Sequence, residues 1–175
     1  MLVSIAVSAA SCGKSSDDKM DTQLQVAEAT WASAKPSCAD YHYAAQSSSV
    51  FGSRSTTTIE ISGGQPVRRS FVGSGYGSSG TDAAPAETWD ESSAAEVGTH
   101  TDGAPALTVE QLFASCESSL SQDPTQNTLT LVVGTDGVPT ACGYTPKNCV
   151  DDCYNGFRLS DFACGPWPGD QAATN

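Results

Sequence analysis

The sequence has few basic residues, few aromatic residues and no long hydrophobic run, and each shortage narrows the possible functions. Eight Lys and Arg residues face twenty Asp and Glu residues, which gives a formal net charge of -12. Because no basic block interrupts this negative charge, a phosphate backbone would be repelled, and nucleic acid is not an expected partner. Aromatic residues make up only 7% of the 175 residues, so the chain is expected to form one domain with a lean core.

Residues typical of common active sites are also scarce. The two histidines, His42 and His100, are too few and too isolated for a zinc site with histidine ligands. The segment GYGSSG (75–80) matches the glycine-rich dinucleotide fingerprint, but the TDAAPAE that follows is not a helix, so we interpret it as part of a surface loop. No Gly-x-Ser-x-Gly elbow and no Cys–His pairing is signalled. We therefore predict no catalytic residue and no cofactor.

The first cysteine follows a short apolar segment. Residues 2–11 (LVSIAVSAAS) are too short to span a bilayer and are typical of the hydrophobic region of an export signal. The small residues directly before Cys12 resemble a bacterial lipoprotein signal, in which that cysteine becomes the lipidated N-terminus. The resemblance implies a signal segment at 1–11 and lipidation at Cys12, followed by a polar tether at 12–20. An ordinary cleaved signal, in which Cys12 is incidental, is the alternative.

Setting Cys12 aside leaves an even set of cysteines, as expected for a disulfide framework in an oxidising compartment. We predict three bridges, and the sequence does not choose among the possible connectivities. The cysteines concerned are Cys38, Cys116, Cys142, Cys149, Cys153 and Cys164.

Hydrophobic periodicity predicts two helices. The first begins with Asp21 as N-cap, buries a stripe that includes Trp31, and ends at Pro36. The second is capped by Thr108 with Gln111 as its capping-box partner. Its buried face consists of Val109, Leu112, Phe113, Cys116 and Leu120.

Alternating residues predict the first strands. Residues 41–45 form a strand that turns His42 toward solvent. A hairpin with a three-residue loop at 63–65 places Glu60 opposite Arg68 as a cross-strand ion pair. It also sets Ile61 beside Val67 and Thr57 beside Phe71. Arg69 then falls on the apolar face, so it must reach an edge or meet a carboxylate.

The remaining strands follow a long flexible loop at 73–107, within which residues 87–91 suggest an edge strand. A two-residue turn at Asp136-Gly137 would pair Val133 with Thr140, Leu131 with Cys142 and Leu129 with Tyr144. Pro139 suits an outward-facing or edge position because it lacks an N–H group. A last strand at 157–164 completes this sheet, and residues 168–175 form a tail.

These elements predict an α+β fold, a single disulfide-stapled domain at 21–167 in which two helices pack on antiparallel β-sheet. The pattern of a helix followed by antiparallel strands occurs twice.

Acidic residues gather in the segment bracketed by Cys149 and Cys153. Asp151 and Asp152, together with Asp136 and Asp161, are candidate oxygen ligands for calcium, although they lack the spacing of a dedicated calcium loop. The alternative is a solvated acidic loop pinned by disulfides. A concave pocket holding several carboxylates would favour an enzyme, and a convex loop would favour a binding protein.

The order of features resembles a loose group of small exported bacterial proteins of unknown function, many of them lipoproteins. The resemblance covers most of residues 21–164 and implies a compact α+β domain without an assigned catalytic residue. The added cysteines and the long loop before Thr108 depart from the group's pattern. The matching segments are Trp31, Tyr41-His42-Tyr43, the strand–Gly–strand segment 59–69, Leu112-Phe113, Asp136-Gly137-Val138-Pro139 and Asp151-Asp152.

We therefore expect an exported, non-catalytic protein with a binding or structural role, anchored to a membrane through lipid on Cys12. It would lie in the cell envelope, at the outer membrane or cell surface and in part facing the periplasm, or be secreted, and its partner would be another envelope protein. The alternative function is a secreted hydrolase or metal-dependent enzyme that uses Asp151 and Asp152.

Overall fold

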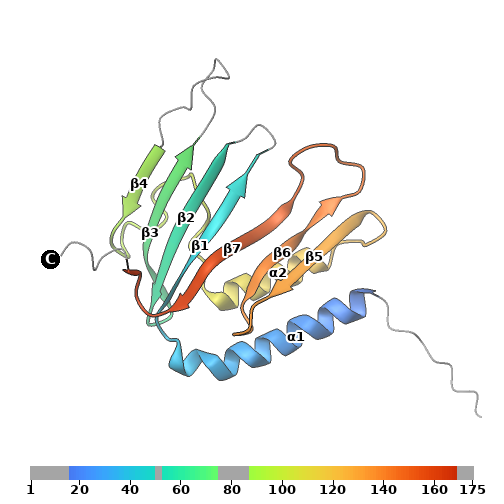
Figure 1. The fold of residues 1–175 in the computed structure, drawn as a ribbon, viewed down its shortest axis with the longest axis horizontal. Helices are drawn as coiled ribbons and strands as arrows, with labels where there is room; N and C mark the ends of the chain where they lie inside the picture. Colours follow the sequence, from blue (N-terminus) through green and yellow to red (C-terminus); the bar gives the residue numbers. More distant parts are fainter. Residues whose placement is uncertain (1–15, 50–52, 75–86, 169–175) are drawn as a thin grey trace, which may run out of the picture.

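The computed structural model describes residues 16–49, 53–74 and 87–168, which form two α-helices and a seven-stranded antiparallel sheet (Figure 1). The strand order is β4-β3-β2-β1-β7-β6-β5. The α+β class and the antiparallel pairing are confirmed. The elements are α1 (Ser16–Ala34), the 3-10 helix η1 (Lys35–Ser37), β1 (Tyr41–Ser48), β2 (Arg54–Ser62), β3 (Gln65–Ser74), β4 (Glu87–Glu91), α2 (Val109–Leu120), β5 (Asn127–Val133), β6 (Pro139–Pro146) and β7 (Asn155–Cys164).

The last strand joins the two halves of the sheet. β7 pairs with β1 on one side and with β6 on the other, so the strands that follow each helix belong to one continuous sheet. The prediction that β7 completes only the second hairpin was therefore incomplete. Helix α2 covers the β7-β6-β5 half, α1 packs against α2 and reaches β1 and β7 through Trp31, and the segment 92–107 covers the β1-β2-β3-β4 half (Figure 1). Among the described residues, no helix is long and apolar enough to cross a membrane.

Helix α1 begins five residues earlier than predicted. Asp21 lies inside the helix rather than at its N-cap, and residues 16–20 are helical rather than part of a polar tether. Residues 16–19 are polar but none of them breaks a helix, and Met20 packs against the core, so the helix extends beyond the predicted start. The predicted stripe is confirmed, with Leu24, Ala27 and Trp31 buried. As predicted, the α-helix ends just before Pro36, which lies in η1.

The β2–β3 hairpin combines the two registers that a two-residue and a three-residue loop would give. Next to the turn, Ile61 lies opposite Pro66, as a two-residue Gly63-Gly64 loop requires. A bulge between Glu60 and Ile61 then shifts the register, so that Glu60 lies opposite Arg68 and Thr57 opposite Phe71. The three-residue loop and the Ile61–Val67 pair were therefore wrong, while the register farther along the strands is confirmed.

His42 is buried, which contradicts the prediction that it faces solvent. It does point to the sheet face opposite the tyrosines, but residues after β7 fold back over that face. The imidazole Nδ1 lies 3.0 Å from the Gly165 carbonyl oxygen, and the Trp167 ring packs against the imidazole in an edge-on contact. Because these residues are distant in sequence, no local pattern around His42 could have indicated the cover.

The edge strand β4 is confirmed at the predicted residues. The dinucleotide-like segment 75–80 lies outside the described residues. Residues 92–107, which the sequence suggested were part of a flexible loop, instead follow a path fixed by contacts with the sheet. For example, the Ala104 N–H donates to the Thr57 hydroxyl oxygen at 2.9 Å. Gly103 lies so close to the sheet that a Cβ there would sit 2.9 Å from the same oxygen.

Helix α2 has the predicted boundaries and cap. The Gln111 N–H donates to the Thr108 hydroxyl oxygen, and the Thr108 N–H donates to the Gln111 side-chain oxygen. The predicted buried face is confirmed at every position: Val109, Leu112, Phe113, Cys116 and Leu120.

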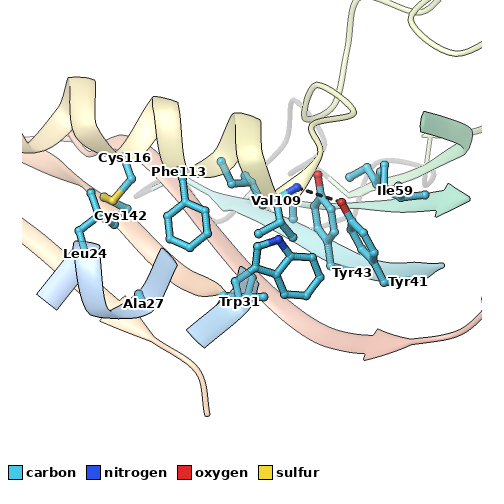
Figure 2. Close-up of a cluster of buried hydrophobic side chains, with 14 of the residues drawn as sticks. Leu24, Ala27, Trp31, Tyr41, Tyr43, Ile59, Val109, Phe113, Cys116 and Cys142 are labelled. Carbon is cyan, nitrogen blue, oxygen red and sulfur yellow. Dashed lines mark hydrogen bonds between the residues drawn. A yellow bond between two sulfur atoms is a disulfide. The ribbon is translucent and has the colours of Figure 1, made fainter. Parts of the chain in front are cut away.

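The core is built around aromatic side chains that α1 and β1 bring together (Figure 2). Trp31 packs edge-on against Tyr41, with ring centroids 5.6 Å apart. The Tyr41 hydroxyl oxygen accepts from the Val109 N–H at 2.9 Å, and the Tyr43 hydroxyl donates to the Leu107 carbonyl at 2.6 Å. Burial raises the pKa of Tyr41 to about 12. The tyrosines therefore remain neutral and tie the segment before α2, and the first residue of that helix, to the sheet.

The β5–β6 hairpin is confirmed away from its turn and corrected next to it. Leu129 lies opposite Tyr144 and Leu131 opposite Cys142, as predicted. A bulge sets Val133 opposite Pro139 instead of Thr140. Pro139 is fully buried on an inner strand, which contradicts its predicted position; as the first residue of β6, its missing N–H costs the ladder little.

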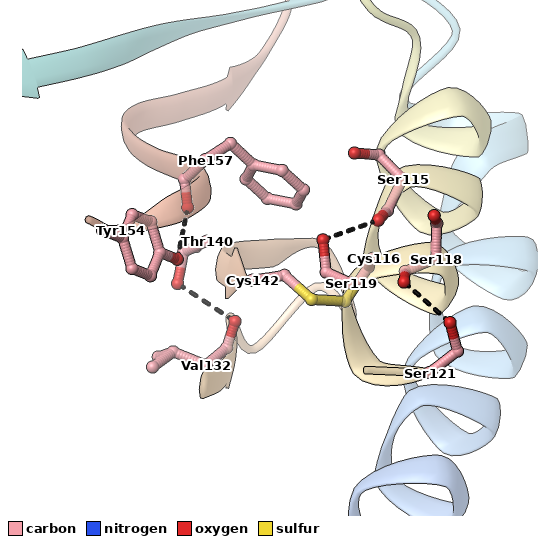
Figure 3. Close-up of a disulfide and its surroundings, with 10 residues drawn as sticks. All are labelled: Ser115, Cys116, Ser118, Ser119, Ser121, Val132, Thr140, Cys142, Tyr154 and Phe157. Atoms are coloured by element: carbon pink, nitrogen blue, oxygen red, sulfur yellow. Dashed lines mark hydrogen bonds between the residues drawn. A yellow bond between two sulfur atoms is a disulfide. The ribbon is translucent and has the colours of Figure 1, made fainter. Parts of the chain in front are cut away.

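The six predicted cysteines form three disulfides. Cys38–Cys164 ties the segment between η1 and β1 to the end of β7, and Cys116–Cys142 ties α2 to β6 (Figure 3). Cys149–Cys153 closes the acidic loop between β6 and β7. The first two therefore fasten distant elements, while the third closes a short local segment.

The disulfides are expected to differ in their contribution to stability. In the chain-entropy description a bridge stabilises more when it closes a longer loop, about 5 kcal/mol for Cys38–Cys164 and about 2 kcal/mol for Cys149–Cys153. Urea unfolding of C38A/C164A and C149A/C153A double variants measures the difference. Equal losses of unfolding free energy in the two variants would contradict this ranking.

Candidate functional site

The acidic loop, residues 149–153, connects β6 and β7 at one end of the sheet (Figure 1). Asp151 and Asp152 are exposed, and Val150 between Cys149 and Asp151 is 95% exposed. The Cys153 N–H donates to the Asp151 carbonyl oxygen at 2.7 Å, so the loop is held by its own backbone as well as by its disulfide. This geometry fits the solvated loop rather than a carboxylate-lined cavity.

The four aspartates proposed as calcium ligands do not converge. Asp136 precedes β6, whereas Asp151 and Asp152 follow it, so the length of the strand, about 25 Å at the usual rise per residue, lies between them. Asp161 lies near the far end of β7 and is likewise distant from the loop. Among the described residues, no group of three or more His, Cys, Asp or Glu side chains is arranged to hold a metal ion.

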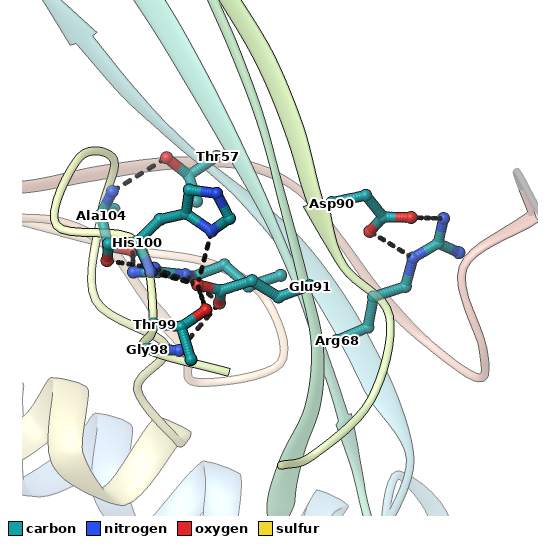
Figure 4. A network of polar contacts seen from close by, with 9 residues as sticks. Thr57, Arg68, Asp90, Glu91, Gly98, Thr99, His100 and Ala104 are labelled. Atoms are coloured by element: carbon teal, nitrogen blue, oxygen red, sulfur yellow. Dashed lines mark hydrogen bonds and ion pairs between the residues drawn. The ribbon is translucent and has the colours of Figure 1, made fainter. Parts of the chain in front are cut away.

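The densest cluster of ionisable side chains lies where the segment 92–107 meets the sheet (Figure 4). Glu91, at the end of β4, is almost fully buried and receives two hydrogen bonds of 2.8 Å from the Arg69 guanidinium. The backbone N–H groups of Gly98 and His100 donate to the same carboxylate at 2.8 and 2.7 Å. Arg69 thus meets a carboxylate, as its place on the apolar face required.

The Arg69 guanidinium holds the pKa of Glu91 well below its ordinary value. Burial opposes this shift, and the N–H groups of His100 and Gly98 add to it. Arg69 also donates to the carbonyl oxygens of His100 and Ala104, at 2.7 and 3.3 Å. Both members of the buried Arg69–Glu91 ion pair therefore bind the backbone of the segment 92–107. Glu91 accepts hydrogen bonds from its N–H groups, and Arg69 donates to its carbonyl oxygens.

Aromatic rings extend this cluster. Trp89 is stacked between Phe71 and His100, with centroid distances of 5.3 and 4.4 Å, and its indole N–H is buried without a hydrogen-bond partner among the described residues. His100 is about half exposed, and its Nδ1 lies 3.2 Å from Glu91. The Glu91 carboxylate lies beside the His100 imidazole as if to orient it, but the Arg69 guanidinium already binds both carboxylate oxygens of Glu91. Its contacts are those of a clamp that fixes the segment 92–107.

The sequence predicted a carboxylate partner for Arg69 without identifying it. The two residues are 22 positions apart, and β4 lies beside β3 only in the folded sheet. On the outer face, the neighbouring Arg68 donates to Asp90 of β4 at 2.9 and 3.0 Å. Arg68 therefore forms an ion pair with Asp90, whereas the predicted partner was Glu60. Both carboxylate partners, Glu91 and Asp90, come from the edge strand β4, which the sequence only suggests.

A shallow groove lies between the N-terminal half of α1 and the C-terminal end of α2. Its volume is about 290 Å³, and we refer to it as the α1–α2 groove. The sequence did not predict it, because its lining residues come from two helices that are distant in the chain. The lining residues are Asp21, Leu24, Gln25, Glu28, Glu117, Leu120 and Ser121.

The clamp at Glu91 leads to a stability prediction. A carboxyl whose pKa is lowered by folding stabilises the fold fully above its unfolded pKa, near 4.5, and this contribution is lost as the pH falls below that value. The Glu91→Gln variant leaves the buried Arg69 charge without a counter-charge and should lose about 3 kcal/mol at pH 7. Its deficit relative to the wild type should shrink at pH 3.

Urea unfolding of both proteins at the two pH values measures this difference. The exposed Glu87→Gln variant on the same strand is the matched control and should unfold like the wild type. A deficit of the same size at pH 7 and pH 3 would argue against the ionic contribution of Glu91.

The chain has no match among protein-family models, curated proteins or solved structures.

Proposed function

We propose that this chain is an exported, lipid-anchored, non-catalytic protein of the cell envelope that acts by binding a protein partner. The observation that carries the proposal is the pairing of the six cysteines beyond Cys12 into three disulfides. Disulfides persist in oxidising compartments such as the periplasm and cell surface. The pairing also makes Cys12 the odd cysteine of the seven, as the resemblance to a lipoprotein signal implies.

The non-catalytic part of the proposal is supported by how the ionisable groups are used. Glu91 and Arg69 neutralise each other and hold backbone groups, and His42 is engaged by the Gly165 carbonyl. The candidate enzyme residues Asp151 and Asp152 lie on the acidic loop. Their exposure on this loop favours the binding protein over the hydrolase or metal-dependent enzyme.

The early start of α1 shortens the proposed tether. Only residues 13–15 separate Cys12 from the first helical residue, Ser16, so this stretch can span at most about 14 Å when fully extended. Lipid on Cys12 would therefore hold α1, and with it the neighbouring α2, close to the membrane surface. Gly13 rather than Asp after the cysteine resembles lipoproteins of the outer membrane, which makes that membrane the proposed location.

Lipidation is tested by intact-mass analysis of the mature protein produced in a bacterium that processes lipoproteins. We expect a chain that begins at Cys12 and carries acyl groups, because several acyl chains together anchor a protein stably. The Cys12→Ser variant should be released or remain unprocessed, with urea unfolding of its folded region unchanged. An unmodified Cys12 thiol, or a mature N-terminus downstream of Cys12, would support the ordinary cleaved signal instead.

A further inference from the structure

We propose that the α1–α2 groove binds a cationic, amphipathic peptide segment of a protein partner. The inference rests on the proposed binding function and names the surface and the chemistry of the partner. It comes from three properties of the groove: an apolar floor, an acidic rim and a small volume.

The floor of the groove is apolar. Leu24 and Leu120 are only 4% and 7% exposed, whereas Asp21, Gln25 and Glu117 around them are exposed. The leucines therefore form the base of the groove, but they are already packed in the core and offer a partner's apolar side chain only a small contact. Apolar burial at this base is correspondingly small, so the charges of the rim carry most of the proposed recognition.

The rim of the groove carries negative charge without a basic residue among those that line it. Asp21 and Glu28 come from α1, and Glu117 faces them from α2. At the opposite end of the helix pair, the Lys35 ammonium bridges to Glu110 at 2.6 Å. Lys35 of η1 thus supplies a cation at one end of the helix pair, whereas the residues that line the groove include three carboxylates and no cation, so that a partner's Lys or Arg would complete the pairing.

The shape of the groove suits a peptide better than a small molecule. Its volume of about 290 Å³ lies just below the range of about 300–1,000 Å³ that is usual for small-molecule sites. Asp21, Gln25 and Glu28 follow one another at i, i+4 and i+7, so this rim runs for about 10 Å along α1. A helical segment that presents an apolar stripe flanked by Lys or Arg matches this length and polarity.

The net charge of the protein acts in the same direction. At -12, the chain attracts a cationic segment over distances comparable with the Debye length and repels an anionic one. Such steering is not specific to the groove, so the test must separate the local carboxylates from the total charge.

The test uses the purified full chain and a fluorescently labelled amphipathic helical peptide of Leu and Lys, with a Leu and Glu peptide of the same pattern as comparison. Anisotropy titrations measure binding to the wild type and to two double variants of equal net charge. E28Q/E117Q removes carboxylates from the groove, and E87Q/D102N removes exposed carboxylates elsewhere. Circular dichroism and urea unfolding verify that each variant is folded.

We expect the Leu–Lys peptide to bind the wild type and the E87Q/D102N variant alike, and to bind the E28Q/E117Q variant about tenfold more weakly. Binding should weaken with salt, and peptide-induced methyl shifts in NMR spectra should centre on Leu24 and Leu120. Equal weakening of peptide binding in both variants would show that binding depends on net charge alone. Methyl shifts centred elsewhere would place the peptide on another surface. Either result, or the absence of binding, overturns the proposal.

The failure of this inference is distinguishable from failure of the proposed function. If the peptide does not bind the groove while mass analysis finds acylated Cys12, the anchored envelope protein stands and this partner chemistry is wrong. If the peptide binds as expected while Cys12 is unmodified, the groove stands and the lipid anchor is wrong.

Discussion

The pairing of β7 with both β1 and β6 is the constraint on which the rest of the structure depends. Without it, the strands that follow α1 and those that follow α2 would form two small sheets, each with additional open edges. Two disulfides act at the same junction. Cys38–Cys164 fixes the end of β7 beside the start of β1, and Cys116–Cys142 fixes the neighbouring strand to α2. A chain with few aromatic residues is thus supported by cross-links where strands from distant parts of the sequence meet.

Each half of the continuous sheet is covered in a different way. Helix α2, with α1 packed against it, covers β5, β6 and β7 through apolar side chains, as expected from the clear stripes on both helices. The other half is covered by an irregular segment with few large apolar residues, so polar contacts replace them. Tyr43 binds Leu107, Thr57 binds Ala104, and the buried Arg69–Glu91 pair binds the stretch between residues 98 and 104. Buried backbone groups of a loop need such partners, which explains why ionisable residues occur in this core.

The features that were predictable from the sequence are those set by local chemistry. The capping box of α2, its buried face and the hairpin registers away from the turns follow from residues within a few positions of one another. The turns themselves were mispredicted, because a bulge in each hairpin absorbs one residue and its cost depends on packing rather than on turn residues. The burial of His42 and the partners of Arg68 and Arg69 depend on segments far away in the chain. The α1–α2 groove was likewise not predictable, because its rim is formed by residues of two helices that are distant in the sequence.

The groove follows from the way in which the two helices are joined. At one end, Glu110 accepts hydrogen bonds from the Trp31 indole at 3.1 Å and from the Lys35 ammonium at 2.6 Å, which draws α1 and α2 together. Burial tends to raise the pKa of Glu110, but these two donors outweigh it and the pKa is lowered, so the carboxylate stays charged. Toward the other end, Leu24 and Leu120 are surrounded by carboxylates from both helices. The lining carries three carboxylates and no basic residue, and this is the charge complementarity on which the proposed cationic partner rests. One end of the helix pair is therefore joined through a cation of the chain itself, while the other end presents carboxylates to which a partner could supply the cation.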